Sequence, residues 1–263
     1  MTPHLELLHQ SAKAPALDAP ALLFVHGAFC GAWCWQYRFM PWFAERGYNC
    51  WALSLEGHAG SEGRNYLSAI SIEDYRRNLV AAVKQIKSTP VMIGHSMGGY
   101  VIQQYLSHAS LPGAAFLASS PPSGMATPSL RMMTQAPELF MKLNLYQHGH
   151  YDPDYVELRG LLFSDDVDDE ALEATIRQCQ PESQRAVMDM ALVHPLAVRP
   201  LHPVNALVLG AAEDRLIAPA DVVATAQRLD VTAEIMPHMA HMMMMDTHWQ
   251  RVAERLLVWL KTL

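Results

Sequence analysis

The pentapeptide Gly94-His95-Ser96-Met97-Gly98 is the feature that most constrains how this chain can fold. It directly follows a short apolar run at residues 91–93, which predicts a buried strand. Residues 98–108, which come next, predict a helix. A serine between two glycines at a strand-to-helix junction is typical of a sharp turn that exposes the hydroxyl group, because a Cβ at either glycine would collide with neighbouring backbone. We therefore predict that Ser96 is a nucleophile.

Short apolar runs alternate with helix-like segments on both sides of this turn. Strands are predicted at residues 21–26, 48–55, 91–93, 113–117, 204–209 and 231–236. Helices are predicted at residues 32–46, 71–86, 98–108, 220–229 and 247–260, with Ser71 and Asp74 as a capping box. Alternation of this kind predicts an α/β fold with a mostly parallel central sheet flanked by helices.

The pattern changes between residues 121 and 200. This stretch begins rich in Ser and Pro, continues as helix-like segments rich in Met and Leu, and shows no strand alternation. We predict that residues 121–200 form a helical cap, or lid, inserted into a core made of residues 1–120 and 201–263. The whole chain would then be one domain.

A serine hydroxyl needs an adjacent base to act as a nucleophile at neutral pH. In folds with this turn, the acid and then the histidine follow the nucleophile along the chain, each in a loop after a strand. The loop after the strand at residues 204–209 contains Glu213 and Asp214, and the loop after the last strand contains His238 and His241. We predict that Asp214 is the acid and His241 the base, with Glu213 and His238 as the alternatives.

These residues predict a mechanism. His241 would take the proton of Ser96, whose oxygen attacks a carbonyl carbon, while Asp214 holds the imidazole in the required tautomer. The resulting oxyanion needs two N–H donors. We expect these donors to be the backbone amides of Met97, which follows the nucleophile, and of Ala28, in the loop after the first predicted strand.

Taken together, four segments resemble the α/β-hydrolase superfamily over nearly the whole chain. They are Phe24-Val25-His26-Gly27-Ala28 with Gly31-Ala32-Trp33, the Ser96 turn with Gly99, Gly210-Ala211-Ala212-Glu213-Asp214, and Ala240-His241 before the last helix. The first segment is similar to the esterase and hydroxynitrile-lyase-like branch. The resemblance implies the α/β-hydrolase fold and a Ser-His-Asp triad.

The chain departs from the family pattern at three places. Ser54-Leu55-Glu56-Gly57-His58-Ala59 stands where the family usually has Asp-x-Arg-Gly-His-Gly, and Ala240 replaces the usual glycine before the catalytic histidine. The nucleophile is Ser96 rather than an aspartate, which argues against the epoxide-hydrolase and haloalkane-dehalogenase branches.

Charge and composition limit the partners. The formal net charge is −7 and no block of five or six Lys and Arg occurs, so we expect neither nucleic acid nor an anionic membrane surface as a partner. No apolar run is long enough to span a bilayer, and the N-terminus lacks the pattern of a signal peptide. We expect a cytoplasmic enzyme that acts on a small molecule.

We expect no metal and no cofactor. The spacing of Cys30, Cys34, Cys50 and Cys179 does not match a zinc site, and small apolar packing residues are the simpler interpretation. Met239 and the run of methionines at residues 242–245 could bind Cu(I), but a flexible apolar wall beside His241 is again the simpler interpretation.

The sequence therefore predicts a serine hydrolase that cleaves a carboxylic ester, thioester or lactone through an acyl-enzyme. Phe29, Trp33 and Met133 are the predicted substrate-binding residues, because they could line an apolar pocket under the cap. The same triad could instead serve a C–C bond hydrolase, a perhydrolase or a hydroxynitrile lyase. An alternative of another class is a receptor that binds a small ligand without turning it over.

Overall fold

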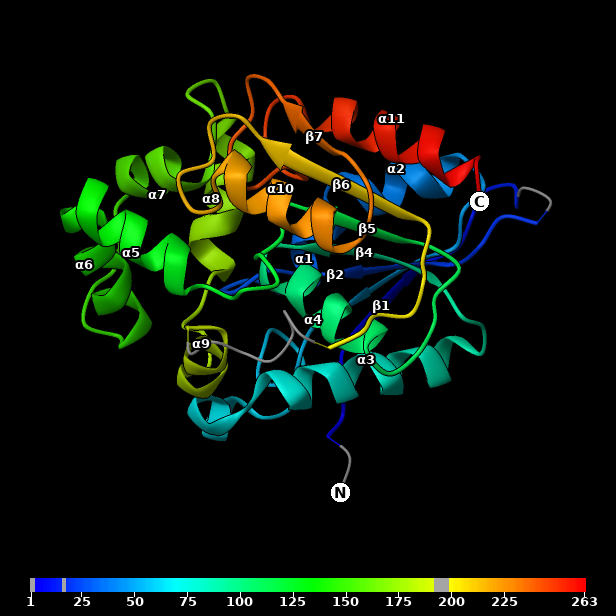
Figure 1. Ribbon diagram of the computed structural model, residues 1–263, viewed down its shortest axis with the longest axis horizontal. Coiled ribbons are helices and arrows are strands. Elements are labelled where there is room, and N and C mark those ends of the chain that lie inside the picture. Colours follow the sequence, from blue (N-terminus) through cyan, green and yellow to red (C-terminus); the bar gives the residue numbers. More distant parts are fainter. Residues whose placement is uncertain (1–2, 16–17, 192–198) are drawn as a thin grey trace.

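A seven-stranded sheet, in the order β1-β3-β2-β4-β5-β6-β7, runs through the centre of the molecule (Figure 1). The computed structural model describes residues 3–15, 18–191 and 199–263. The strands are β1 (Leu7–Gln10), β2 (Leu22–Val25), β3 (Cys50–Leu53), β4 (Val91–His95), β5 (Ala114–Leu117), β6 (Ala206–Ala211) and β7 (Ala233–Met236). All neighbouring strands pair in parallel except β1, which is antiparallel to β3. The predicted fold class is confirmed.

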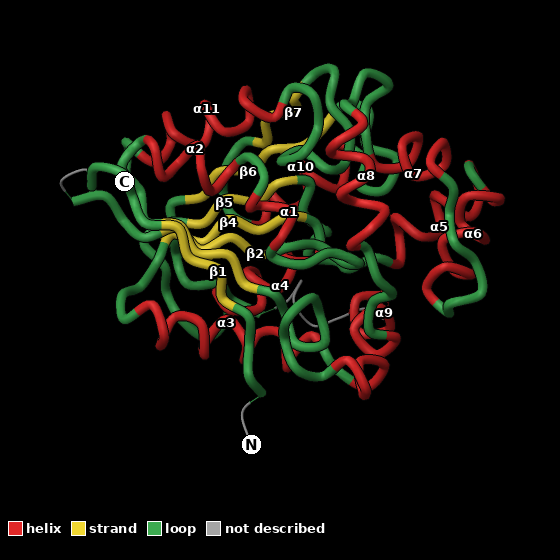
Figure 2. The backbone as a smooth tube through the Cα atoms, turned by 180° about the vertical axis from the view of Figure 1, so that it is seen from behind, coloured by secondary structure: helices red, strands yellow, loops and turns green. Residues whose placement is uncertain are grey.

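Helices cover both faces of the sheet (Figure 2). Strand β2 is buried on both sides: Leu22 and Phe24 belong to one core cluster, and Leu23 and Val25 to the other. The first cluster includes residues of α1 (Trp33–Gln36), α2 (Phe39–Glu45) and α11 (Trp249–Leu260). The second includes residues of α3 (Ile72–Ile86), α4 (Met97–Leu106) and α10 (Pro219–Arg228). This double burial explains why the strands are continuous apolar runs.

The predicted helix at residues 32–46 is instead two helices. Helix α1 ends at Gln36 and α2 begins at Phe39. Pro41 accounts for the break, because its ring would collide with the carbonyl group of residue 37 in a continuous helix and it lacks an N–H. At its actual place in the first turn of α2, a proline is tolerated.

The sequence pattern does not predict β1. This edge strand has only four residues, and none of them is fully buried. It therefore shows no clear two-residue hydrophobic alternation. Its pairing with β3 is supported by stacking of His9 on Trp51, with ring centroids 3.8 Å apart.

Five helices lie between β5 and β6 in the described part of the sequence, and we call them the cap helices. They are α5 (Ala126–Gln135), α6 (Pro137–Gln147), α7 (Tyr155–Leu162), α8 (Asp169–Gln178) and α9 (Gln184–Ala191). Figure 1 shows α5 to α8 beyond the end of the sheet toward which β6 points. Residues 121–200, the predicted cap, contain no strand in their described part, and residues 192–198 lie outside it.

The contact between α4 and β2 leaves no room for a side chain at Gly98. A Cβ there would lie 2.4 Å from Val25 O and 2.5 Å from His26 O, both rigid backbone atoms. We predict that Gly98→Ala lowers the free energy of unfolding by about 1–3 kcal/mol, the usual effect of overpacking. Gly160, within α7, is the matched control, because the nearest atom to a Cβ there is Arg215 Nη1 at 3.7 Å.

Gly160→Ala should raise stability by about 0.5–1 kcal/mol, because alanine has the higher helix propensity. Urea denaturation of both variants tests this pair. Equal effects of the two substitutions on the free energy of unfolding would show that the approach of α4 to β2 does not exclude a side chain at residue 98.

Candidate active site

Ser96 occupies a strained turn between β4 and α4. Its backbone has φ 50° and ψ −117°, a left-handed region that L-residues rarely adopt. The turn is held by the hydrogen bond from Ser96 N to Leu117 O (3.0 Å) and by Ser96 O, which accepts from Gly99 N (3.1 Å). The side chain of Ser96 thus projects at the carboxyl edge of the sheet, as the sequence pattern predicts.

His241 and Asp214 come together from the loops after β7 and β6. His241 Nδ1 and Asp214 Oδ2 are 2.7 Å apart, and the two residues are 4% and 8% exposed. The other carboxylate oxygen, Oδ1, accepts from Leu216 N (2.8 Å) and Ile217 N (2.9 Å). The carboxylate is therefore fixed on both oxygens and can hold one tautomer of the imidazole.

The alternatives Glu213 and His238 lie on the surface. Glu213 Oε1 is 3.7 Å from His238 Nδ1, and their side chains are 50% and 79% exposed. Neither has a described hydrogen bond to Asp214 or His241. The preferred pair, Asp214 and His241, is thus the one that is buried and in close contact, whereas the alternative pair is exposed.

His95 links the Ser96 turn to the His241 loop. His95 Nε2 donates to His241 O (2.9 Å), and the two rings are 4.6 Å apart. Complete burial, followed by the charge of His241, lowers the pKa of His95 well below its ordinary value, so this ring stays neutral. Among the described residues Ser96 Oγ has no hydrogen bond to His241, which is common in catalytic pairs before substrate binds.

The loop after β2 passes beside Ser96. A Cβ built on Gly27 would lie 3.0 Å from Ser96 Cβ. His26 Nε2 accepts from Leu55 N (3.0 Å), so His26 Nδ1 carries the proton and donates to Gly27 O (2.7 Å). Because C=O and N–H point in opposite directions across a trans peptide, Ala28 N–H faces away from the His26 ring.

Both amides expected to bind an oxyanion are free. Within the described ranges, neither Ala28 N nor Met97 N donates to a protein acceptor. Met97 is the first residue of α4, and amides of the first helical turn have no partner within their helix. Met97 N directly follows Ser96 in the sequence, and Ala28 N directly follows Gly27, which lies beside Ser96.

A cavity of about 950 Å³ lies between the cap helices and the loop after β6. Its wall is mainly apolar and includes Phe29, Met132, Tyr146, Leu161 and Asp214. Neither Ser96 nor His241 is part of this wall, so the cavity meets the site at Asp214 and Phe29.

Two of the three predicted substrate-binding residues are elsewhere. Trp33 is 6% exposed and belongs to the core cluster against the sheet. Met133 is 47% exposed and does not line the cavity, whereas its neighbour Met132 does. Successive residues of a helix point about 100° apart, so composition alone could not choose between the two methionines.

The family profile described as "Alpha/beta hydrolase family" matches residues 22–255. The chain belongs to the alpha/beta hydrolase family. Solved structures of similar fold include a bromoperoxidase from Bacillus anthracis, with a TM-score of 0.71, 14% identity and coverage of 98% of this chain and 96% of the bromoperoxidase. A thermophilic esterase from Thermogutta terrifontis has a TM-score of 0.70 at 16% identity, over 99% and 94% of the two chains.

The curated relatives include esterases and a pyrethroid hydrolase. Methylesterase 8 of Arabidopsis thaliana is 26% identical over 160 residues, which cover 58% of each protein. The pyrethroid hydrolase of Sphingobium wenxiniae is 29% identical over 87 residues, or 33% of this chain and 30% of the relative. The chain thus spans less than two thirds of the length of these relatives.

Ser54, which stands where the family pattern usually has Asp, contacts a carboxylate from elsewhere in the chain. Ser54 Oγ accepts from Ala32 N (2.9 Å) and donates to Glu6 Oε2 (2.5 Å). Glu6 lies ahead of β1. Sequence analysis could not find this pair, because the two residues are far apart in the chain.

Asp246 is a buried carboxylate that joins the His241 loop to the cap. It is 0% exposed and accepts from Ala240 N (2.8 Å), Thr247 N (2.8 Å) and Ser164 N (3.3 Å). In the sequence, Asp246 directly follows the methionine run at residues 242–245, and these methionines are buried in the core. An acidic residue at the end of a buried run is a signal that could have pointed to it. A second bond, from Met242 N to Leu162 O (2.9 Å), runs beside it.

No cluster of three or more His, Cys, Asp or Glu side chains suited to a metal occurs within the described residues. The four cysteines are free thiols, and all but Cys179 are buried. None of the described helices combines the length and apolar character needed to cross a membrane.

The buried neutral histidines make stability depend on pH. Burial, followed by the charge of His58, lowers the pKa of His26 to about 3, and His95 is lowered in the same direction. Below about pH 6.5 the unfolded chain binds protons at these two positions that the folded chain does not bind. The free energy of unfolding should therefore decrease as the pH is lowered, by on the order of 1.4 kcal/mol per pH unit for each histidine.

Urea denaturation at pH 7.5, 6 and 5 measures this slope. His95→Gln, whose amide can still donate toward His241 O, should remove about half of it. A free energy of unfolding that stays constant between pH 7.5 and 5 would contradict the burial of neutral His26 and His95.

Proposed function

We propose that this member of the family is a serine esterase, which cleaves a carboxylic ester, thioester or lactone of a small, mainly apolar substrate. Ser96 is the nucleophile, His241 the base and Asp214 the acid of the triad. The observation that carries the proposal is the buried 2.7 Å contact between His241 and Asp214, on loops joined to the Ser96 turn through His95.

The reaction would proceed in two halves. His241 Nε2 takes the proton of Ser96 Oγ, which attacks the carbonyl carbon, and the oxyanion binds to the amides of Ala28 and Met97. The tetrahedral intermediate then expels the alcohol, which receives the proton from His241. A water molecule, deprotonated by His241, attacks the acyl-enzyme and releases the acid and Ser96.

The cavity supports an apolar substrate. Its volume of about 950 Å³ would hold an acyl or alcohol group much larger than methyl, next to Phe29 and Met132. The names of the relatives, methylesterase and pyrethroid hydrolase, agree with ester cleavage. No cofactor enters this mechanism.

Hydrolysis of p-nitrophenyl esters with short to long acyl chains tests the proposal. We expect turnover by the wild type and a loss of roughly 10³-fold or more in Ser96→Ala and in His241→Ala. The best chain length would measure the space available to the acyl group.

His238→Asn is the matched control for His241→Ala. His238 is exposed and has φ 55°, a conformation that asparagine tolerates, so this variant should keep the wild-type rate within twofold. Equal losses in His238→Asn and His241→Ala would contradict the assigned base. Turnover of a cyanohydrin or a C–C substrate without turnover of any ester would contradict ester cleavage as the reaction.

A further inference from the structure

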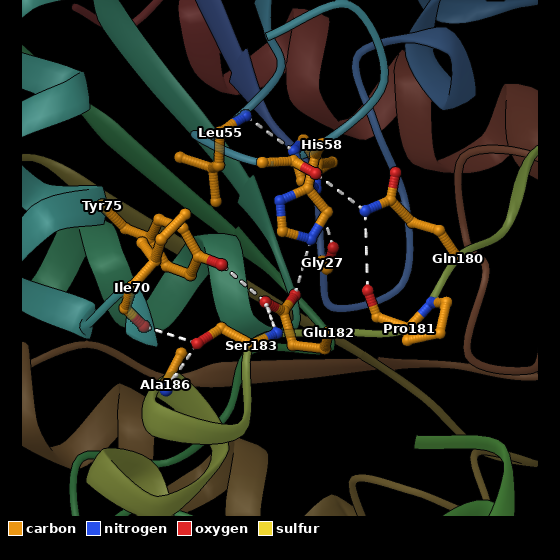
Figure 3. A network of polar contacts seen from close by, with 12 residues as sticks. Gly27, Leu55, His58, Ile70, Tyr75, Gln180, Pro181, Glu182, Ser183 and Ala186 are labelled. Atoms are coloured by element: carbon orange, nitrogen blue, oxygen red, sulfur yellow. Dashed lines mark hydrogen bonds and ion pairs between the residues drawn. The ribbon is translucent and has the colours of Figure 1, made fainter. Parts of the chain in front are cut away.

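Glu182 is a carboxylate of the cap that is buried against the core without taking part in the proposed triad. It is 2% exposed and lies between α8 and α9. Its Oε2 is 3.0 Å from His58 Nε2, while Oε1 accepts from Tyr75 Oη (2.6 Å) and Ser183 N (2.6 Å) (Figure 3). Both oxygens of the carboxylate thus have a partner.

The backbone of Glu182 is held as firmly as its side chain. Gln147, the last residue of α6, donates through Nε2 to Glu182 O (2.5 Å) and accepts from Glu182 N (3.2 Å). Burial alone would raise the pKa of Glu182. The charge of His58 and the hydrogen bonds from His58, Tyr75 and Ser183 hold that pKa below its ordinary value. The group is therefore a carboxylate at neutral pH.

His58 carries this contact toward the loop after β2. Its Nδ1 is 3.1 Å from Glu56 O, so each of its ring nitrogens faces an oxygen acceptor. The His58 ring is 5.1 Å from the ring of His26, which in turn fixes Gly27 O and hence the direction of Ala28 N–H. One continuous chain of contacts thus joins the cap to a proposed oxyanion donor.

Gln180 makes a second connection to the same loop. Gln180 N donates to Phe29 O (3.0 Å), and its side-chain amide donates to Gly57 O (3.0 Å) and accepts from Ala59 N (3.1 Å). Phe29 has φ 67°, a strained backbone for a bulky residue that must be held by its surroundings. The contact with Gln180 supplies part of that support.

We infer that residues 180–183, which we call the anchor segment, position the loop after β2. We call this loop, which contains Ala28, the oxyanion loop. Glu182 is a positioning residue that acts through His58 and His26. The inference rests on the proposed esterase function. Loss of Glu182 should misdirect Ala28 N–H and weaken the transition state without changing the cavity that binds the substrate.

The experiment compares three variants of Glu182 with a control. In Glu182→Gln the amide nitrogen can donate to His58 Nε2 while the amide oxygen accepts from Tyr75 and Ser183, so the network stays closed. Glu182→Ala opens it, and Glu182→Asp keeps the charge but shortens the reach to His58. Asp168→Asn is the control, because Asp168 also joins the cap to the core, through Arg38, but has no described contact with the loop after β2, and asparagine can still cap α8.

Two measurements separate positioning from folding. The rate is expressed per active site titrated with a fluorophosphonate, which phosphonylates the nucleophilic serine and releases fluoride. An alkylboronic acid reports on the oxyanion loop, because Ser96 Oγ adds to boron, its proton passes to His241, and the adduct places a negative oxygen near the amides of Ala28 and Met97.

For Glu182→Ala we expect kcat per titrated site to fall about 10-fold to 100-fold, with KM within twofold of wild type. Its boronic acid affinity should fall by the same factor. Glu182→Gln should stay within about threefold of wild type, Glu182→Asp should be intermediate, and Asp168→Asn should match wild type.

Three outcomes would overturn the inference. A Glu182→Ala enzyme with the kcat per site and boronic acid affinity of Asp168→Asn would show that Glu182 serves only folding. If Glu182→Ala does not fold, a wild-type kcat per site and a wild-type boronic acid affinity in Glu182→Asp would likewise show that Glu182 serves only folding. A wild type that neither reacts with the fluorophosphonate nor turns over esters would contradict the proposed function itself, and the inference with it.

Discussion

The close approach of α4 to β2 is the constraint on which the site depends. Because Gly98 has no side chain, the first turn of α4 lies against Val25 O and His26 O at the carboxyl edge of the sheet. At this approach β4 runs into α4 through the left-handed backbone of Ser96. The loop after β2 also lies beside the same serine, so one packing contact helps to position both Ser96, the proposed nucleophile, and the groups around it.

Buried histidines surround this turn, and their surroundings give each a different chemical character. His26 and His95 are held neutral by burial, and each donates one hydrogen bond to a backbone carbonyl group, of Gly27 and of His241. His241 faces a carboxylate on Nδ1, which suits the proposed role of a base. His58 faces acceptors on both nitrogens, which suits a fixed link. Identical side chains thus differ in character because of the atoms that each nitrogen meets.

The parts of this molecule that sequence predicts are those in which the signal is local. The Ser96 turn, the apolar strands and the positions of Asp214 and His241 after β6 and β7 all follow from patterns a few residues long. The proposed positioning role of Glu182 could not be predicted, because its contacts are not local. His58 and Tyr75 are separated from Glu182 by 124 and 107 positions in the sequence. Local composition likewise could not choose Met132 over Met133 as a wall residue, because helix orientation decides it.

The cap is joined to the core at the two loops that complete the site. The anchor segment contacts the loop after β2 at Phe29 and through His58, and residues 162 and 164 contact the His241 loop at Met242 and Asp246. The cavity wall is made largely by α5, α6 and α7. Two of these helices also carry connections at their last residues, because Gln147 of α6 donates to Glu182 O and Leu162 O of α7 accepts from Met242 N. Substitutions at other positions of the three helices can therefore alter the space for a substrate while these connections stay in place. In the proposed enzyme, such changes would alter substrate choice without moving Ser96, Asp214 and His241.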